Sequence, residues 1–317
     1  MALDETLVRG LKLPLICAPM FLVSGPELVS AACRNGVIGA FPTANARTPD
    51  ILNEWLLAIT GICSHAGDSQ PAALWAANLV THPTNARFEA DLALVEAYRA
   101  PIVISALGGP ARLVERAHRW GGKVFADVNS VPYARKAVDA GVDGLILVSS
   151  GAGGHTGAMN GLAFLEAVRA FFAGPVALGG GLSTGAGIRA VEVAGADLAV
   201  MGTAFIATHE SLATPPYKQM LVDAEFEDLT LTSAVTGVPA NWLRSTLIAE
   251  GMDPNQSSAD MVVDFTERDS KPKRWKNVWS AGHGVGGTKA VESAGDLIAR
   301  LHEEYLASAR APSRFIV

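Results

Sequence analysis

The sequence has few of the features of a secreted, membrane-bound or nucleic-acid-binding protein. Only three of its 317 residues are cysteine, and they are too scattered for a disulfide framework or a CxxC metal site. No apolar run reaches the roughly 18 residues of a membrane span, and the first ten residues, MALDETLVRG, lack the basic start of a signal peptide. A net charge of -6 offers no basic face to a phosphate backbone. We therefore expect a soluble, cytoplasmic protein that binds neither nucleic acid nor a membrane.

Several catalytic and nucleotide-binding motifs are also missing. The lack of a GxxxxGK[ST] loop argues against a nucleoside triphosphate, and the lack of a GxSxG elbow argues against an α/β-hydrolase. No GxGxxG follows an expected strand, so a Rossmann-type dinucleotide site is not predicted. The histidines lack partners at metal-ligand spacing, so no metal is expected.

What the chain does contain is a regular succession of apolar runs, turns and helical segments. Eight runs recur: PLICAP, VIGAF, AALWAAN, PIVISA, GKVFADV, GLILVSS, PVALGG and DLAVMG. Most are apolar throughout, as parallel strands covered on both faces are, and segments such as GPELVSAACRNG, VPYARKAVDAG and TGAGIRAVEVAG between them have helical spacing. Eight such units predict a TIM (β/α)8 barrel, with an open doubly wound sheet as the alternative.

The composition divides the chain into three parts. Residues 1–211 are expected to form the barrel, and residues 278–317 to return to its outside through a helix in AVESAGDLIARLHEEYLAS. Residues 212–277 are more polar and are expected to form a small, mostly helical inserted domain over the barrel mouth. PPYKQMLVDAEF and PANWLRSTLIAEG are its expected helices, and no buried strand is predicted there.

Glycines collect where the seventh and eighth expected strands end, in LGGGLSTG and MGTAF. Backbone N–H groups without side chains, at helix starts, form anion sites. In TIM barrels the loops after strands seven and eight frequently bind phosphate. We call the predicted site the phosphate cradle; it comprises Gly179, Gly180, Gly181, Gly202 and Thr203.

Polar residues follow four other expected strands, where a barrel has its chemistry. They are Asn78 after the third, Ser105 after the fourth, Lys123 and Asp127 in the fifth, and Ser149 and Ser150 after the sixth. A lysine beside a buried strand needs an anionic partner. Lys123 could pair with Asp127, extend outward or contact a phosphorylated cofactor.

One histidine stands out by its surroundings, which are the small residues of SSGAGGHTGAMN at 149–160. Glycines on both sides allow the backbone to approach a planar ligand closely. His155 is the one titratable side chain of this loop, and imidazole titrates near neutral pH. These properties suit a general base or a proton donor.

Taken together, APM at 18–20, AAN ending at Asn78, AGGHTG around His155, LGGGLSTG, MGTAFIATHES and VWSAGHGVGG resemble the nitronate monooxygenase (formerly 2-nitropropane dioxygenase) family of FMN-dependent enzymes. The resemblance runs from Pro14 to about Gly287. It implies a TIM barrel with an inserted helical domain, FMN and no metal. The cofactor contacts that it implies, with the phosphate cradle, are Ala18, Pro19, Met20, Asn78, Lys123, Asp127, Ala152, Gly153 and Gly154.

The resemblance also implies a reaction, namely the oxidation of an alkyl nitronate by oxygen to a carbonyl compound and nitrite. His155 would be the base or would orient the substrate, with Ser105, Ser150 and His283 close by. Val148 stands where members often have an acid, and His283 where glutamine is common. The expected partners are a small-molecule substrate and oxygen, and the expected state is a monomer or homodimer.

Two other functions stay open. An NAD(P)H-dependent flavin reductase acting on quinones or enoyl thioesters would share the GGH loop, and SKPKRWK (Lys271, Lys273, Arg274, Lys276) could then hold a nucleotide phosphate or an acyl-carrier protein, although a solvated basic turn is expected there. A flavin-free barrel that binds a phosphorylated metabolite is the second alternative. Aldolase chemistry would need Lys123 for a Schiff base.

Overall fold

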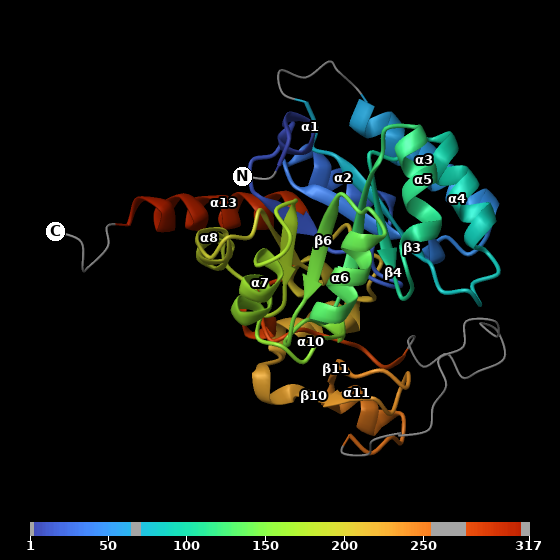
Figure 1. Cartoon of the computed structure of the whole chain (residues 1–317). Coiled ribbons are helices and arrows are strands. Elements are labelled where there is room, and N and C mark those ends of the chain that lie inside the picture. Colours follow the sequence, from blue (N-terminus) through green and yellow to red (C-terminus); the bar gives the residue numbers. More distant parts are fainter. Residues whose placement is uncertain (1–2, 65–70, 255–276, 312–317) are drawn as a thin grey trace.

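The computed structural model describes residues 3–64, 71–254 and 277–311 of the chain. Its centre is a closed barrel of parallel strands in the order β1-β2-β3-β4-β5-β6-β8-β9 (Figure 1). β1 pairs with β9 as well as with β2, so the sheet closes on itself. The strands are β1 (Leu15–Cys17), β2 (Ile38–Pro42), β3 (Trp75–Val80), β4 (Ile102–Ala106), β5 (Lys123–Val128), β6 (Gly144–Val148), β8 (Val176–Gly179) and β9 (Leu198–Met201).

Each of the eight apolar runs contains or begins one barrel strand, and β2 and β3 end one and two residues beyond their runs, so the predicted TIM barrel is confirmed and the open sheet is excluded. Helices between the strands cover the outside of the barrel (Figure 1). They are α2 (Pro26–Arg34), α3 (Pro49–Ser64), α4 (Phe88–Ala97), α5 (Ala111–Arg119), α6 (Val131–Asp139), α7 (Gly161–Arg169), α8 (Gly185–Val193) and the short α9 (Thr203–Ile206). The three helices expected from the sequence between the strands are α2, α6 and α8.

The strands bury both faces because their residues alternate between two apolar clusters. One cluster fills the barrel interior and includes Ile16, Ile38, Ile104, Phe125 and Ile146. The other lies between the strands and the outer helices. At the amino end of the barrel, the short helix α1 (Glu5–Val8) adds Leu7 to the interior cluster. Each such side chain contributes about 1.5–3 kcal/mol by leaving water.

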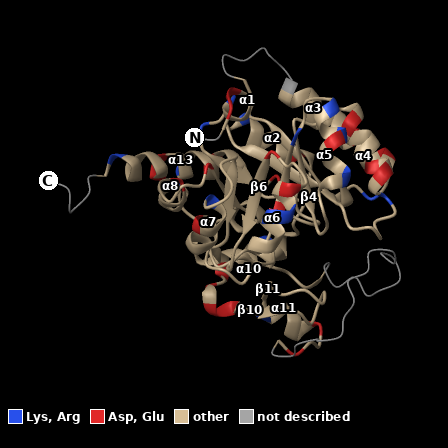
Figure 2. Ribbon diagram, in the orientation of Figure 1, with Lys and Arg blue, Asp and Glu red and all other residues tan. Residues whose placement is uncertain are grey.

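Many of the charged residues lie on the outer helices (Figure 2). Between α4 and α5, Glu89 forms ion pairs with Arg112 at 2.9 Å and with Arg116 at 3.0 Å, and Arg116 also reaches Glu96 at 2.5 Å. Exposed pairs of this kind stabilise a fold only slightly. No helix within the described ranges has the length and apolar character needed to cross a bilayer.

The described part of the predicted insertion, residues 212–254, lies at one end of the barrel (Figure 1). It contains the expected helix α10 (Pro215–Asp223), a second helix α11 (Arg244–Ala249), and two strands, β10 (Leu229–Thr232) and β11 (Ala240–Leu243). The expectation of no buried strand was therefore wrong, because all four residues of β11 are buried. PANWLRSTLIAEG begins as a strand rather than a helix, since β11 pairs with β10 on one side and with β7 (Gly154–His155) on the other.

After the insertion, the chain returns to the outside of the barrel through α13 (Ala294–Arg310), as expected. α13 lies beside α8 (Figure 1). Gly185 at the start of α8 touches it closely, because a Cβ at that position would overlap the Leu301 carbonyl oxygen. Glu304 accepts a hydrogen bond from the Gly185 N–H at 2.7 Å, so α13 satisfies an amide at the start of α8. The basic run SKPKRWK lies outside the described residues.

Candidate active site

The carboxyl end of the barrel brings together most of the residues predicted from the sequence. Ala18, Pro19 and Met20 follow β1 directly, while Gly179 ends β8 and Gly202 follows β9. β1 and β9 are neighbours in the ring, which places the APM stretch beside the phosphate cradle. A Cβ at Gly202 would lie 3.2 Å from Met20 Sδ and 3.4 Å from Ala18 Cβ. Glycine therefore keeps this corner of the barrel mouth open.

The loop after β1 is held by a residue that the sequence analysis did not select. Asn45, in the 3-10 helix η1 (Thr43–Asn45), donates to the carbonyl oxygens of Met20 at 2.9 Å and Ser24 at 2.8 Å, and accepts from the Leu22 N–H at 2.8 Å. Leu22 adopts a left-handed backbone conformation with φ of 62°, which costs a non-glycine residue about 1 kcal/mol or more. Asn45 thus fixes the shape of the APM loop.

The phosphate cradle has the properties of an anion site. Among the described residues, the N–H groups of Gly180, Gly202 and Thr203 donate to no backbone carbonyl. Gly180 has φ of 136°, and a Cβ there would overlap Ser149 Oγ. The side chain of Thr203 is already engaged, because its Oγ1 accepts from the Gly282 N–H at 2.9 Å. Amides that donate to no backbone carbonyl are the kind of group that binds a phosphate.

His155 is held by the insertion. It lies on β7, where His155 faces Ala240 and Gly154 faces Asn241 across an antiparallel pairing with β11. Its Nε2 lies 3.2 Å from Thr236 Oγ1, in the loop between β10 and β11. The imidazole is half-buried, and loss of solvent lowers its pKa below the ordinary value of 6.5. His155 is therefore mainly neutral at pH 7, which suits a general base.

The rest of the glycine-rich loop is anchored by β11 as well. The buried Asn241 donates from Nδ2 to the Ala152 carbonyl oxygen at 2.8 Å. Gly153 lies against the backbone of Ala281 and Gly282, so the loop is enclosed between β11 and the segment after the insertion. The sequence analysis missed this support because it predicted a helix where β11 lies.

His283 reaches the same region from the chain after the insertion. Its N–H donates to the Gly151 carbonyl oxygen at 2.9 Å, and its exposed ring meets the Phe226 ring edge-on at a centroid distance of 4.8 Å. Burial of one side of the ring lowers the pKa of His283. Close by, Trp279 stacks on Tyr217 of α10 at 4.9 Å, and the Tyr217 hydroxyl donates to the Ser280 carbonyl oxygen at 2.5 Å.

Two predicted site residues do not lie in the barrel mouth. Lys123 is the first residue of β5, at the amino end of the barrel, where it forms ion pairs with Asp4 at 3.4 Å and Asp143 at 3.5 Å. It is therefore neither a cofactor contact at the mouth nor paired with Asp127. Ser105 alternates with the interior residue Ile104 and hydrogen-bonds to Thr81 at 3.1 Å, so it faces the outer helices.

Asp127 and Asn78, in contrast, have the inward orientation that a site residue requires. Asp127 follows Phe125 by two residues on β5, and Asn78 follows Ala76 by two on β3, and both preceding residues belong to the interior cluster. Asn78 is buried and donates to the Ile104 carbonyl oxygen at 3.4 Å. Asp127 is half-buried, and loss of solvent raises its pKa from 3.8 to about 7.

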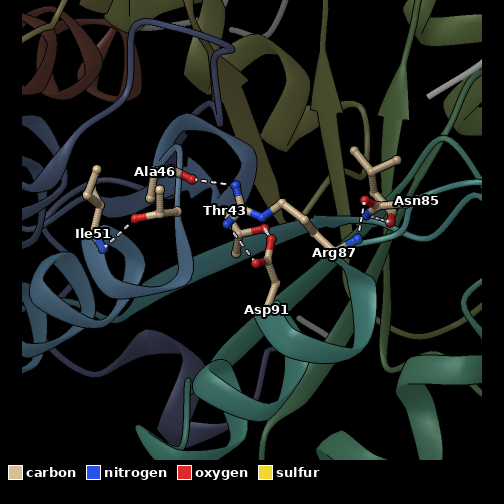
Figure 3. Close-up of polar contacts among 8 residues, drawn as sticks. Thr43, Ala46, Ile51, Asn85, Arg87 and Asp91 are labelled. Carbon is tan, nitrogen blue, oxygen red and sulfur yellow. Dashed lines mark hydrogen bonds and ion pairs between the residues drawn. The ribbon is translucent and has the colours of Figure 1, made fainter. Parts of the chain in front are cut away.

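An ion pair behind the mouth ties the loops after β2 and β3 together (Figure 3). Arg87 donates to Asp91 at 2.8 Å and to the Ala46 carbonyl oxygen at 2.7 Å, and the Thr43 hydroxyl donates to the other oxygen of Asp91 at 2.9 Å. Asp91 is only 3% exposed, so the pair is largely shielded from water. It holds the segment that contains Asn45, and through Asn45 the APM loop.

Comparisons with known proteins identify the family of this chain. The sequence matches the family described as nitronate monooxygenase over residues 5–304. A nitronate monooxygenase of Paraburkholderia phytofirmans is 27% identical over 77% of this chain and 77% of its own length. A Mycobacterium tuberculosis protein, (3aS,4S,5R,7aS)-5-hydroxy-7a-methyl-1-oxo-octahydro-1H-indene-4-carboxyl-CoA dehydrogenase, is 28% identical over 75% of this chain, which spans 65% of that protein.

Solved structures agree in fold. Nitroalkane oxidase from Streptomyces ansochromogenes superposes with a TM-score of 0.79 at 27% identity, covering 96% of this chain and 99% of that one. FabK from Thermotoga maritima superposes with a TM-score of 0.75 at 22% identity, covering 94% of each chain, and supports the fold alone. Because the family match extends over most of the barrel and its mouth, this chain belongs to the nitronate monooxygenase family and is a flavin-dependent oxidoreductase.

Proposed function

We propose that the protein uses FMN to oxidise alkyl nitronates with oxygen, giving a carbonyl compound and nitrite. The observation that carries this proposal is the placement of His155, a half-buried neutral imidazole, beside glycine-lined backbone on the barrel rim. Family membership and the likeness to a nitroalkane oxidase support the same chemistry. The oxidation of nitro compounds by a flavin is the general reaction, and nitronates are the substrate class proposed within it.

The cofactor would lie between the APM loop and the phosphate cradle. The free N–H groups of Gly180, Gly202 and Thr203 would hold the FMN phosphate, because each can donate without losing a backbone bond. The loop atoms of Ala18, Pro19 and Met20, with Asn78 across the mouth, would contact the ring, and Ala152, Gly153 and Gly154 would cover it. Bound FMN supplies the redox chemistry, whereas the protein supplies orientation and proton handling.

His155 would act at the substrate's nitro end. A neutral imidazole has one ring nitrogen with a lone pair and one with a hydrogen. When Nε2 carries the hydrogen, it donates to Thr236 Oγ1 across the 3.2 Å contact. In this tautomer Nδ1 would be the nitrogen that takes the α-proton from a neutral nitroalkane. Once protonated, His155 would attract the anionic oxygens of a nitronate.

The test is turnover by the FMN-loaded enzyme with propyl 2-nitronate under air. We expect oxygen consumption and nitrite release without NADH or NADPH. His155→Asn should lower kcat/KM by about 10²–10⁴, the usual contribution of a general acid–base group, and change FMN affinity little. His302→Asn, on the outer helix α13, is the matched control and should match the wild type.

Other outcomes point to other functions. Full nitronate oxidation by His155→Asn would exclude the role of the imidazole. Rapid anaerobic bleaching of the flavin by a pyridine nucleotide, without reaction toward nitronate, would favour a reductase of quinones or enoyl thioesters. A protein that does not take up FMN would favour a flavin-free barrel binding a phosphorylated metabolite.

A further inference from the structure

Asp127 is a carboxyl group in the barrel mouth that no hydrogen bond or ion pair from the described residues satisfies. Its orientation follows from strand alternation. Phe125 belongs to the interior cluster, whereas Val124, Ala126 and Val128 belong to the cluster beneath the outer helices. Asp127 therefore points into the barrel at the carboxyl end of β5, one layer above Phe125.

The surroundings of Asp127 contain little charge. In the strand register Asp127 lies beside Ile146 of β6. On the inner face, Ile104 of the other neighbouring strand, β4, lies one layer closer to the amino end of the barrel than Asp127. Neither β4 nor β6 contains a titratable residue, and α5 and α6 pack on the opposite face of β5. Among the described residues of other elements, the imidazoles of His155 and His283 are titratable groups on the same side of the barrel. Within the described residues, no Lys or Arg forms an ion pair that would stabilise an ionised Asp127 carboxylate.

The position of β5 in the ring favours the substrate over the cofactor. Four steps around the eight-stranded barrel separate β5 from β1, so Asp127 lies across the mouth from Ala18, Pro19 and Met20. Of the two strands that carry the phosphate cradle, β9 is adjacent to β1 and three steps from β5, whereas β8 is two steps from each. A flat ring bound beside β1 would therefore face Asp127 from the opposite side of the mouth, and a small substrate would bind between them.

We propose that Asp127 remains protonated when an anionic substrate is bound, donates a hydrogen bond to its charged oxygen and thereby determines specificity for such substrates. The proposal rests on the proposed function for the identity of the anion. A bound anion beside an ionised carboxylate would be repelled, whereas the neutral acid forms a charge-assisted hydrogen bond. Binding at a pH above that at which the free carboxyl ionises must therefore take up a proton, in a step that is separate from turnover.

Propionate tests this because it presents two anionic oxygens as a nitronate does but is not oxidised by this reaction. Calorimetric titration of the FMN-loaded enzyme at pH 8, in two buffers of different ionisation enthalpy, gives the protons taken up per propionate. We expect on the order of one for the wild type and for His155→Gln, and none for Asp127→Asn. Asp139→Asn, an exposed carboxyl on α6, should behave as the wild type.

The affinity should follow the same pattern. Above pH 7, the propionate Kd of the wild type should rise about tenfold for each pH unit, whereas that of Asp127→Asn, whose amide always donates, should stay flat. Asp127→Leu should bind about tenfold or more weakly at low pH, because the donor is missing. Should the substituted proteins not fold, infrared difference spectra of the wild type at pH 8 should still show a protonated-carboxyl stretch on propionate binding.

Three results would overturn the proposal: equal proton uptake by the wild type and Asp127→Asn, no propionate binding by the wild type, or a loss of FMN affinity in Asp127→Asn with propionate binding unchanged. The last would make Asp127 a cofactor residue. Nitronate oxidation is measured separately. If nitronates are oxidised but proton uptake on propionate binding does not depend on Asp127, only the role of Asp127 is refuted. If proton uptake depends on Asp127 but nitronates are not oxidised, only the proposed substrate is refuted.

Discussion

At the scale of single residues, the chemistry of the mouth depends on contacts made far along the chain. His155 meets Thr236, a residue 81 positions away, through a 3.2 Å contact to its hydroxyl. Thr236 Oγ1 also donates to the Val238 carbonyl oxygen at 3.1 Å, within the same turn. Because the hydroxyl hydrogen of Thr236 is engaged by the Val238 carbonyl oxygen, the Thr236 oxygen can accept a hydrogen bond from His155 Nε2–H. Thr236 is thus a positioning residue that favours one tautomer.

Replacing Thr236 by valine keeps the shape and removes the hydroxyl. We expect kcat to fall about fivefold to tenfold, as for a hydrogen bond of about 1 kcal/mol, with KM changed less and the acid limb of the pH profile displaced. Thr236→Ser should restore the wild-type profile. Stopped assays of nitrite release between pH 5 and 9 measure this, and identical profiles for all three proteins would remove Thr236 from the mechanism.

At the scale of elements, one short strand decides the geometry of the site. β11 lies between β10 and β7, and its Asn241 holds the Ala152 carbonyl oxygen at 2.8 Å. Its four residues are too few for a reliable alternation pattern, and the helix-like residues that follow it hid it in the sequence. β11 is held in place because β7 pairs with it on the side away from β10. In this pairing Ala240 faces His155, which lies 85 residues earlier in the chain.

Asn241→Leu tests this element. It leaves the buried Ala152 carbonyl without its donor, and an unsatisfied buried group costs about 1–3 kcal/mol. We expect FMN to bind about 5-fold to 100-fold more weakly, as measured by flavin fluorescence on titration. Leu231→Thr, an exposed position on the adjacent β10, is the control and should bind FMN normally. Equal affinities for both variants would mean that β11 does not shape the cofactor site.

At the scale of the whole molecule, stability and chemistry lie at opposite ends of the barrel. The amino end is closed by α1, where Leu7 joins the interior cluster and Asp4 pairs with Lys123. The carboxyl end holds the loops, the insertion and the glycines. TIM barrels in general have their chemistry at the carboxyl end and stabilising contacts at the amino end. Lys123, placed at the wrong end by the sequence analysis, therefore belongs to the structural half.

Leu7→Ala should separate the two ends. Leu7 is 2% exposed, and truncating such a side chain lowers the free energy of unfolding by about 2–5 kcal/mol. Below the unfolding transition, kcat and KM should stay at wild-type values, because α1 lies at the amino end of the barrel and the candidate site at its carboxyl end. Urea unfolding followed by circular dichroism gives the first quantity, and nitrite assays give the second. A large change in kcat would show that the barrel transmits strain between its ends.

The sequence by itself determined the barrel and the location of its mouth. Eight local apolar runs each become one strand, because a run buried on both faces needs no information from elsewhere. Gly180 and Gly202 could likewise be selected from the sequence as strand-end glycines, and their binding of a phosphate stays a prediction. His155 could also be selected from the sequence as a candidate site residue, because the small residues around it are its neighbours in the chain.

The tertiary structure decided what surrounds those residues. The hydrogen bond from Asn45 to Met20 and the pairing of β11 with His155 join segments distant in the sequence, and the burial that raises the pKa of Asp127 also comes from distant segments. The end of the barrel at which Lys123 lies depends on where β5 begins, a boundary that composition leaves uncertain by a few residues. Local patterns specify elements, whereas burial, hydrogen-bond partners and pKa arise only when distant segments exclude water together.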